Sequence, residues 1–408
     1  EKEKFAMLTF ELDALSTLAL ALLLLGLGAQ LKKRSYWLRQ LCVPAPVIGG
    51  FGFALVIWLL RDQQLLNLTL DTSLQTPLMV AFFTTVGLGG SLGLLRKGGK
   101  LLFIYLGACW GLALVQNVVG VSVAKLLGID PLLGIMAGAV SLEGGFGAAA
   151  AFGPIAENLG AVGATTAALA AATFGMVAGG LLGSPLARWL IERNKLVVKA
   201  EAVGSLKAFE EVVHTPPPAL DAATLLRLLT CIVVIMVLGF WLGSSLQQHL
   251  GIVLPSYVGA MFVAIILRNL NDRAQVIEMP DQAVSTIGDV CLGMFLTMAM
   301  MSLKFWELEK LGLPLLVILV VQVVIMILLC VFVLFRLFGR NYDAAVLCAG
   351  FMGHGLGATP NAVANMGAIC DHYKVFSYKA FIIVPLCGAV LIDIVAIPMI
   401  TWFINAYS

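Results

Sequence analysis

Charged side chains are scarce in this sequence, because Asp, Glu, Lys and Arg make up only 12% of its 408 residues. Soluble domains carry about a quarter of such residues. Hydrophobic residues account for 60%, and the mean hydropathy is +0.99. The chain therefore lacks the polar side chains that cover a soluble globule. We expect a protein embedded in a lipid bilayer, long enough for about ten crossings at ~20 apolar residues each.

Several signatures of other protein classes are also missing. The net charge is only +2, and no basic stretch is interleaved with aromatic residues, as nucleic-acid binders require. The eight cysteines form no CxxC pair and no Cys/His cluster, so we interpret them as small apolar side chains of packed helices. No HExxH motif of a metallopeptidase occurs. An intramembrane enzyme and a channel remain as alternatives from other functional classes.

Apolar runs of spanning length predict ten transmembrane helices. The runs lie near residues 12–31, 41–60, 74–92, 101–127, 161–190, 224–243, 252–270, 283–303, 312–338 and 376–405. Two further segments, 132–156 and 344–367, are apolar but unusually rich in glycine and alanine. Irregular backbone at membrane depth is tolerated where it is buried in protein or lines a cavity. We therefore expect both segments to be re-entrant loops that enter and leave the membrane on the same side.

Lysine and arginine concentrate in alternate connections, which is the bias that marks cytoplasmic loops. They follow the first, third and seventh helices, and they also flank the second Gly-rich segment. The hydrophilic linker 192–222 carries four more, together with Pro216-Pro217-Pro218, which suits a stiff solvated connector. This pattern predicts that the linker is cytoplasmic and that both termini lie on the outer side of the membrane.

An internal repeat relates the two halves of the chain. Segment 43–50 resembles 254–260, Ser91-Leu92 corresponds to Ser302-Leu303, and Gly145–Ala148 corresponds to Gly355–Ala358, at offsets of 211, 211 and 210. Five crossings are an odd number, so the second half is expected to be inverted relative to the first. We therefore predict an all-α polytopic fold of two inverted repeats, 1–191 and 223–408, each with five helices and one Gly-rich re-entrant loop.

The two Gly-rich loops are the expected substrate site. Glycine permits close approach of a ligand to the backbone. A short helix after each loop would aim its N-terminal N–H groups at an anion, and freed carbonyls would suit a sodium ion. We expect these residues to contact the substrate: Ser141, Glu143, Gly144, Gly145, Gly147, Gly355, Gly357, Thr359, Asn361, Asn365 and Asp393.

Ionisable and amide side chains inside apolar runs are costly and usually functional. Asp393 stands in an apolar stretch, where it could meet a cation or a substrate ammonium or could act as a structural helix cap. Asp289 lies in the eighth helix, and Gln116 and Asn117 lie in the middle of the fourth. We expect a sodium ion near Asn117, Asp289, Asp393 and the carbonyls of the re-entrant loops. His354 has a structural or a proton-transfer role.

Longer stretches are specific enough to compare with known proteins. They are Pro44-Ala-Pro-Val-Ile-Gly-Gly50, Pro77-Leu-Met-Val-Ala-Phe-Phe83, Val115-Gln-Asn117, Gly128-Ile-Asp-Pro131, Leu303-Lys-Phe-Trp-Glu307, Asn341-Tyr-Asp-Ala-Ala-Val-Leu347, Gly355-Leu-Gly-Ala-Thr-Pro360, Ala364-Asn-Met366 and Ile392-Asp-Ile394. Together they resemble the sodium/glutamate symporter family of bacterial inner membranes over essentially the whole chain.

This resemblance implies sodium-coupled import of L-glutamate by alternating access, with sodium as the coupling ion, no other cofactor and no enzymatic activity. It also implies a homodimer with a moving transport domain, an inner-membrane location and periplasmic termini. The first loop departs from the family's Ser-Gly-Gly-His-Gly-Thr, because Glu143, Phe146 and Ala148 replace the serine, histidine and threonine. The alternative within the class is a sodium- or proton-coupled transporter of another amino acid or carboxylate.

Overall fold

The computed structural model describes residues 8–40, 43–91, 99–196, 221–250, 256–307 and 311–408. The first half contains β1 (Leu8–Leu12), α1 (Ala14–Arg34), α2 (Tyr36–Gln40), α3 (Ala45–Asp62), β2 (Leu66–Leu70), α4 (Gln75–Leu88), α6 (Gly99–Leu126), α7 (Pro131–Ile135), the π-helical η1 (Met136–Val140), α8 (Gly145–Asn158) and α9 (Ala164–Arg193). The second half contains α11 (Ala222–Leu250), α12 (Ser256–Ala274), α13 (Asp281–Met301), the 3-10 helix η2 (Phe305–Glu307), α14 (Gly312–Leu329), the π-helical η3 (Cys330–Leu334), α15 (Phe335–Leu337), α16 (Tyr342–Gly355), α17 (Thr359–Tyr373), α18 (Tyr378–Leu386), the π-helical η4 (Cys387–Leu391) and α19 (Asp393–Tyr407).

All ten apolar runs expected to cross the membrane are helical over most of their length. Within the described residues, seven helices are long and apolar enough to span a bilayer. The run 74–92 forms a shorter helix, α4, which ends at Leu88 before two glycines. The prediction of an all-α polytopic membrane protein is therefore confirmed at this level. Most of the linker 192–222, including the three prolines, lies outside the described residues.

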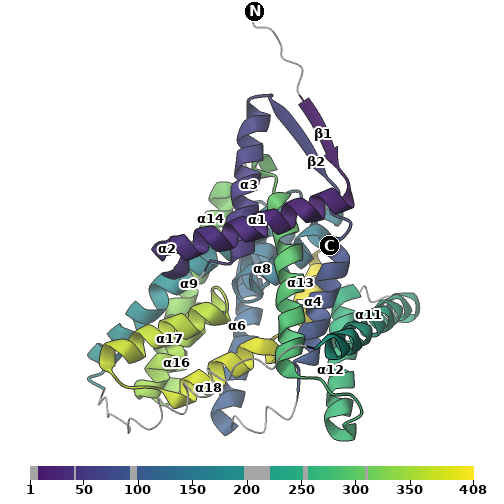
Figure 1. Ribbon diagram of the computed structural model, residues 1–408. Helices are drawn as coiled ribbons and strands as arrows, with labels where there is room; N and C mark the ends of the chain where they lie inside the picture. The colour runs from purple at the N-terminus through teal and green to yellow at the C-terminus, as the bar shows by residue number, and fades with distance from the viewer. Residues whose placement is uncertain (1–7, 41–42, 92–98, 197–220, 251–255, 308–310) are drawn as a thin grey trace, which may run out of the picture.

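A short β-structure was not expected from the sequence. Strands β1 and β2 pair in parallel, with Leu8 opposite Leu66 and Leu12 opposite Leu70 (Figure 1). The alternation of apolar and polar residues in Leu66-Asn-Leu-Thr-Leu70 is typical of a strand. The strand was missed in the sequence because this stretch is only five residues long and lies between two apolar helices.

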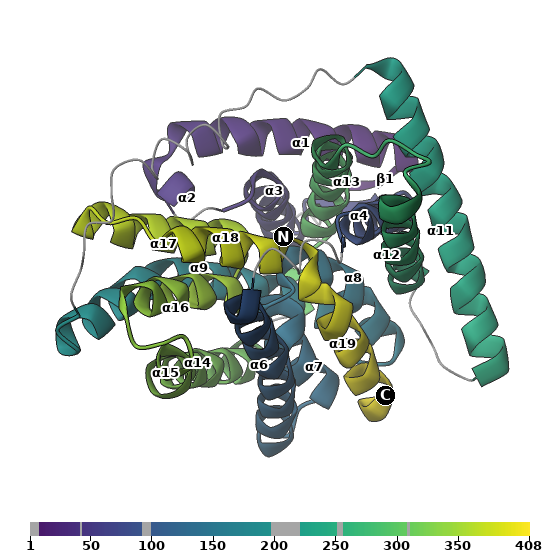
Figure 2. The ribbon, with the colours of Figure 1, turned by 90° about the horizontal axis from the view of Figure 1, so that it is seen from below.

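The helices pack into two groups that lie side by side (Figure 2). The first group contains α1, α3, α4, α11, α12 and α13, in which α4 packs on α12 and α13 and α1 packs on α3. The second group contains α6 to α9 and α14 to α19, in which α9 packs on α8, α16 and α17. Each group takes elements from both halves of the sequence, so the spatial division does not follow the linear one. The groups meet between α8 and α13, between α12 and α19, and between α4 and η4.

The starts of equivalent elements follow the repeat seen in the sequence. Asp130 accepts a hydrogen bond from the Leu132 amide at the start of α7, and Asn341 accepts one from the Ala344 amide at the start of α16. These two caps are 211 positions apart. Helices α3 and α12 likewise begin 211 positions apart. The inverted relation of the two halves stays a prediction.

Both segments expected to be irregular loops are largely helical. Each has a helix on either side of a short turn, which makes a first hairpin from α7, η1 and α8 and a second hairpin from α16 and α17. Alanine favours helix on both sides, whereas glycine breaks the helix at the turn and at Gly138, whose φ and ψ are −102° and −133°. The prediction of irregular backbone was therefore wrong for most of 132–156 and 344–367. Whether each hairpin enters and leaves on one side of the membrane stays a prediction.

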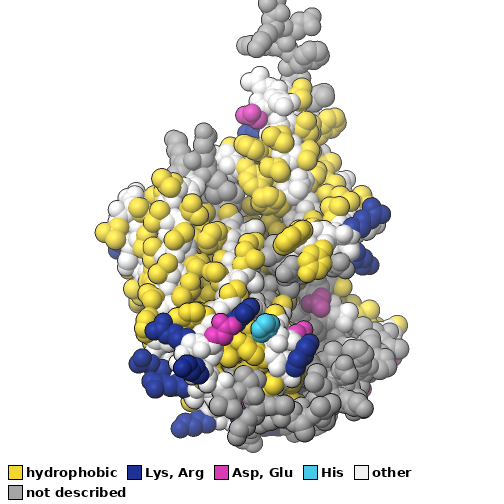
Figure 3. Space-filling model, turned by 90° about the vertical axis from the view of Figure 1, so that its left-hand side faces the viewer, with side chains coloured by type: hydrophobic (Ala, Val, Ile, Leu, Met, Phe, Trp, Pro, Cys, Tyr) yellow, Lys and Arg dark blue, Asp and Glu magenta, His cyan; other side chains and the backbone are white. Residues whose placement is uncertain are grey.

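The outer surface has the apolar character that a lipid environment requires. On the face shown in Figure 3, apolar side chains cover most of the area, and most charged side chains gather in its lower part. Large apolar residues are exposed along the peripheral helices, including Leu23 on α1, Trp241 on α11 and Leu313 on α14. A soluble monomer rarely exposes apolar patches of this extent.

Candidate functional site

The tips of the two hairpins meet in the middle of the second helix group. Gly145, at the tip of the first hairpin, has a φ of +61°, and a Cβ atom there would lie 3.1 Å from the carbonyl oxygen of Gly357. Gly357 lies in the turn of the second hairpin. The structure therefore brings together the two Gly-rich segments that the sequence selected, although they are more than 200 residues apart.

The second hairpin is fastened to α9 by two asparagine side chains. Asn361 Nδ2 donates to the Met176 carbonyl oxygen at 2.8 Å, and Asn365 Nδ2 donates to the Gly179 carbonyl oxygen at 2.8 Å. Both asparagines are buried. Their amide donors are used for packing between helices, which costs less than leaving them unpaired. Both asparagines lie in the Gly-rich segment where the sequence placed the substrate site. Their amide groups, however, donate to α9.

The Ser141 hydroxyl also lies at carbonyl oxygens of neighbouring helical segments. Its Oγ lies 2.5 Å from the Met136 carbonyl oxygen and 2.8 Å from the Ala168 carbonyl oxygen, and the side chain is fully buried. The hydroxyl therefore joins η1 to α9. Gly144 is held inside the same hairpin, because a Cβ atom there would lie 2.5 Å from Ala148 Cβ.

The remaining predicted contact residues lie around the tips. Gly147 faces the first helix group, since a Cβ atom there would lie 3.3 Å from the Phe82 ring on α4. Thr359 is partly exposed at the start of α17, and its Oγ1 lies beside Gly388 in η4. The ring of His354 packs on the same glycine, and its Nδ1 has no hydrogen-bond partner within the described part of the chain.

Two glutamine side chains connect the second hairpin to α6 and α14. Gln116 Nε2 donates to the Gly355 carbonyl oxygen at 2.7 Å, and Gln322 Nε2 donates to the Gln116 carbonyl oxygen at 2.7 Å. Both side chains are 1% exposed, so each Nε2 donor is paired in a dry environment, whereas neither Oε1 has a hydrogen-bond partner among the described residues. Sequence reasoning noted Gln116 but missed Gln322. The signal was available, because Gln322 interrupts the most apolar helix of the chain.

Two acidic residues lie close together in the second group. Glu143 is 8% exposed, and neither of its carboxylate oxygens has a hydrogen-bond partner among the described residues. Asp393 is partly exposed at the start of α19. Helix α19, which Asp393 begins, packs on η1, which precedes Glu143, and this places the two carboxylates within electrostatic range of each other. The structure thus pairs two of the acidic residues that the sequence had singled out separately.

The three residues expected near sodium are not all in one place. Asn117 is fully buried on α6 next to Gly138, and neither its Oδ1 nor its Nδ2 has a partner within the described chain. Asp393 belongs to the same helix group. Asp289 instead lies on an exposed face of α13 in the first group. No group of three or more His, Cys, Asp or Glu side chains able to hold a metal occurs in the residues that the structure describes.

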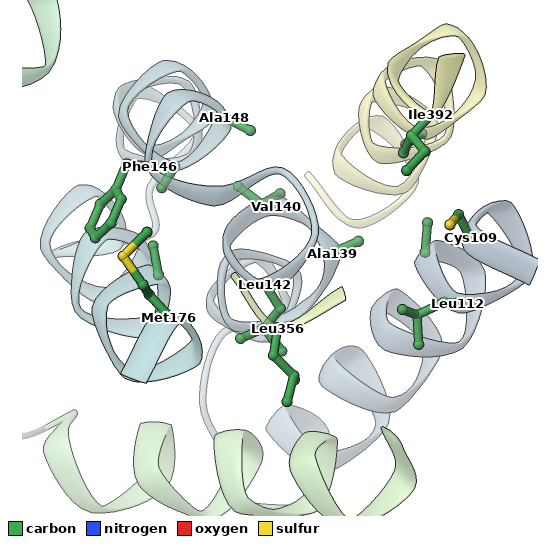
Figure 4. Close-up of a cluster of buried hydrophobic side chains, with 14 of the residues drawn as sticks. Cys109, Leu112, Ala139, Val140, Leu142, Phe146, Ala148, Met176, Leu356 and Ile392 are labelled. Atoms are coloured by element: carbon green, nitrogen blue, oxygen red, sulfur yellow. The ribbon is translucent and has the colours of Figure 1, made fainter. Parts of the chain in front are cut away.

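Apolar side chains surround the turn that carries Glu143. Figure 4 shows Ala139 on the side of the hairpin that faces Cys109 on α6 and Ile392 in the η4–α19 segment, and it shows Phe146 beside Met176 on α9. Phe146 is 6% exposed, so its ring is a packing element of the hairpin. The environment of Glu143 therefore offers few polar groups to stabilise an ionised carboxylate.

Ser91 requires separate consideration, because Gly89-Gly90-Ser91-Leu92-Gly93 has the GxSxG spacing of a hydrolase nucleophile. In hydrolases this motif forms a turn from a strand into a helix. Here Ser91 follows the C-terminal end of α4, and its Oγ donates to Asp272 Oδ2 at 2.5 Å. Asp272 is in turn ion-paired with Arg268. The serine therefore lacks the strand context of a nucleophile and belongs to an ionic cluster.

Known proteins are similar to this chain over nearly its whole length. The profile of the family described as sodium/glutamate symporter matches residues 10–375. The sodium/glutamate symporters of Escherichia coli (strain K12) and Shigella flexneri are each 40% identical over 395 residues, which are 95% of this chain and 96% of the relative. The sodium/glutamate symporter of Haemophilus influenzae is 38% identical over 399 residues, with the same coverage.

Proposed function

This chain belongs to the sodium/glutamate symporter family, and on that premise we propose that it imports L-glutamate together with sodium across the bacterial inner membrane. The observation that carries the proposal is the 40% identity over 95% of the chain to a protein named as a sodium/glutamate symporter. The family consists of transporters, so the chain is a multi-pass transporter and not an enzyme.

The hairpin tips are the proposed substrate site. Helices α8 and α17 both begin at the tips, and neither has a side-chain hydrogen bond to cap its first turn. Uncapped N–H groups and the partial positive charge of a helix start favour a carboxylate. Glutamate has two carboxylates, so each helix start can hold one. The residues retained for this site are Gly144, Gly145, Gly147, Gly355, Gly357 and Thr359, while Ser141, Asn361 and Asn365 hold the hairpins on α9.

Sodium is proposed to bind in the second helix group, close to the substrate. The supporting residues are Asn117 and Asp393, whose side-chain oxygens are hard ligands of the kind sodium prefers. Asp289 is left out of this site, because α13 belongs to the other group. Alternating access then corresponds to movement of the second group, which carries the hairpins, relative to the first. The homodimer stays a prediction from the family resemblance.

A transporter of a different amino acid or carboxylate is the second candidate. The observation that favours it is Glu143, because an ionised carboxylate at the hairpin tip repels an acidic substrate. A neutral amino acid would avoid that repulsion. The two candidates differ in substrate and share the fold and the transport class.

Uptake into proteoliposomes tests both candidates. We expect radiolabelled L-glutamate to accumulate when a sodium gradient is directed inward, and to stop accumulating when potassium replaces sodium outside. A panel of neutral amino acids and dicarboxylates, each at the same concentration, serves as the comparison. Saturable sodium-driven uptake of another compound in preference to glutamate would establish the second candidate instead.

The orientation in the membrane is also a proposal, with both termini periplasmic and the linker 192–222 cytoplasmic. One end of the second group is polar, with a cavity of about 340 Å³ at the starts of α6, α16 and α18 that is lined by Lys100, Leu101, Phe338, Asn341, Asp343, Lys379 and Ile383. At the opposite end of α6, Lys125 lies 4.5 Å from the centre of the Tyr407 ring near the C-terminus. The residues at the first end flank loops rich in Lys and Arg, which supports a cytoplasmic location.

Cysteine labelling checks this orientation. In a background without native cysteines, Glu201→Cys is expected to react with a membrane-impermeant maleimide only from the cytoplasmic side, and Ser408→Cys only from the periplasmic side. The reason is the opposite location of the linker and the C-terminus in a five-plus-five inverted arrangement. Reaction of both positions from one side would rule out that arrangement.

A further inference from the structure

Glu143 is a buried acidic residue of the second helix group whose carboxylate has no hydrogen-bond donor and no counter-charge among the described residues. More than nine-tenths of its surface is buried, and both Oε1 and Oε2 lack a hydrogen-bond partner among the described residues. Neither Glu143 nor Asp393 has a salt bridge within the described chain. A buried carboxylate without a donor or counter-charge is strongly disfavoured, so this arrangement points to a missing positive partner.

Each of the two acidic residues comes two or three positions after a π-helical turn. The π-helical turn η1 ends at Val140, three residues before Glu143, and η4 ends at Leu391, two residues before Asp393. A π-helical turn takes carbonyls out of the regular hydrogen-bond ladder and is frequently found at functional sites. Gly138 inside η1 is also non-helical, and the buried amide of Asn117 lies beside it. Helix α19, which begins with Asp393, packs on η1, so Asp393 lies on a helix that contacts the distorted turn before Glu143.

Among the described residues, no positively charged group lies within electrostatic range of this pair. The groups that interact electrostatically with Glu143 are Asp393, Tyr105 and Cys109, and Tyr257 interacts with Asp393. Tyr105 and Tyr257 are buried, and their hydroxyls have no partner among the described residues. The site therefore offers carboxylate, amide and carbonyl oxygens. This set suits a hard monovalent cation and lacks the histidine or thiolate cluster that a transition metal would select.

We propose that Glu143 and Asp393 jointly bind a sodium ion, with backbone carbonyls of η1 and η4 and the Asn117 amide as neighbouring oxygen donors. This inference rests on the proposed function, because it adds Glu143 to the sodium site of that same transporter. It also reduces the conflict between Glu143 and an acidic substrate. One bound sodium ion lowers the combined charge of the two carboxylates from −2 to −1 before glutamate reaches the hairpin tips, so sodium binds first and prepares the site.

Sodium binding can be measured without transport. Purified wild-type protein in detergent is expected to gain thermal stability as sodium replaces potassium at constant ionic strength, because a ligand that binds only the folded state stabilises it. Glu143→Gln is expected to raise the sodium concentration for half-maximal stabilisation at least about tenfold, which corresponds to the loss of one good charged ligand. Glu143→Asp should lie between the two, since it keeps the charge and shortens the reach.

Glu157→Gln is the matched control, because it makes the same substitution in the same hairpin. Glu157 Oε1 accepts a hydrogen bond from the Thr165 amide at 2.9 Å, and the amide oxygen of glutamine can accept it equally. This control is expected to keep the sodium dependence of the wild type. If Glu143→Gln does not fold, Glu143→Asp tests the same inference, because its shorter carboxylate should raise the sodium concentration for half-maximal stabilisation, and an unchanged concentration would overturn the proposal.

Uptake measurements separate the possible outcomes. If Glu143→Gln weakens sodium dependence at every pH from about 6 to 8, the sodium site is supported. If it leaves sodium dependence unchanged and only makes uptake less sensitive to pH, Glu143 holds a proton and the proposal is overturned. Stabilisation by sodium in a protein that moves no glutamate would contradict the proposed function and leave the sodium site standing.

Discussion

Asp393→Asn is expected to abolish sodium-driven glutamate uptake while leaving the protein folded. The substitution keeps the shape of the side chain and removes its negative charge. Asp393 begins α19, two residues after the end of the π-helical η4, within electrostatic range of Glu143. In the proposed site Asp393 is a charged ligand of sodium, and removing the charged partner of a desolvated ion costs about 3–5 kcal/mol, so the initial rate at physiological sodium should fall by roughly two orders of magnitude or more. The measurement is initial uptake of radiolabelled glutamate at a series of sodium concentrations.

Asp130→Asn provides the control for Asp393→Asn. Asp130 caps α7 by accepting a hydrogen bond from the Leu132 amide at 2.8 Å, and asparagine caps helices about as well as aspartate. The control should therefore keep uptake and expression close to those of the wild type. Uptake by Asp393→Asn at normal sodium concentrations would show that Asp393 has a structural role only.

The positions of the membrane helices were predictable from the sequence because they depend on local composition. An apolar run near 101–127 became α6, and one near 312–338 became the α14–α15 segment. The hydrophobic cost of exposing such runs to water determines them without knowledge of their neighbours. The sequence did not predict which helices pack together. That depends on close approaches between helix backbones, such as Gly120 against Gly134, which only the folded chain reveals.

The candidate site was predictable in position but not in its internal contacts. The repeated glycines predicted the positions of both hairpins. Glycine destabilises a helix, so its repetition in an apolar segment indicates a role other than spanning the membrane as a regular helix. The sequence did not predict that the amide groups of Asn361 and Asn365 would donate to α9, or that Gln322 would join α14 to α6. Polar residue type alone does not distinguish a ligand contact from a bond between helices, because both satisfy a buried donor equally well.

The meeting of the two hairpin tips leads to a second prediction of a large effect, for Gly145→Ala. Gly145 has a positive φ, and a Cβ atom there would lie 3.1 Å from the Gly357 carbonyl oxygen. An alanine would strain the backbone by about 1–3 kcal/mol and would press against the opposite tip. Because the tips form the proposed substrate site, a displacement of a few tenths of an ångström should lower the initial uptake rate about tenfold or more.

Gly128→Ala separates the effect of backbone strain from that of contact between the tips. Gly128 has a φ of +70°, close to that of Gly145, but no atom lies within 4 Å of the position of its Cβ, apart from its chain neighbours. Both variants should therefore lose a similar amount of thermal stability, whereas only Gly145→Ala should lose most of its uptake per folded molecule. An equal loss of uptake in both variants would mean that strain alone is responsible, and that the contact between Gly145 and Gly357 does not matter for transport.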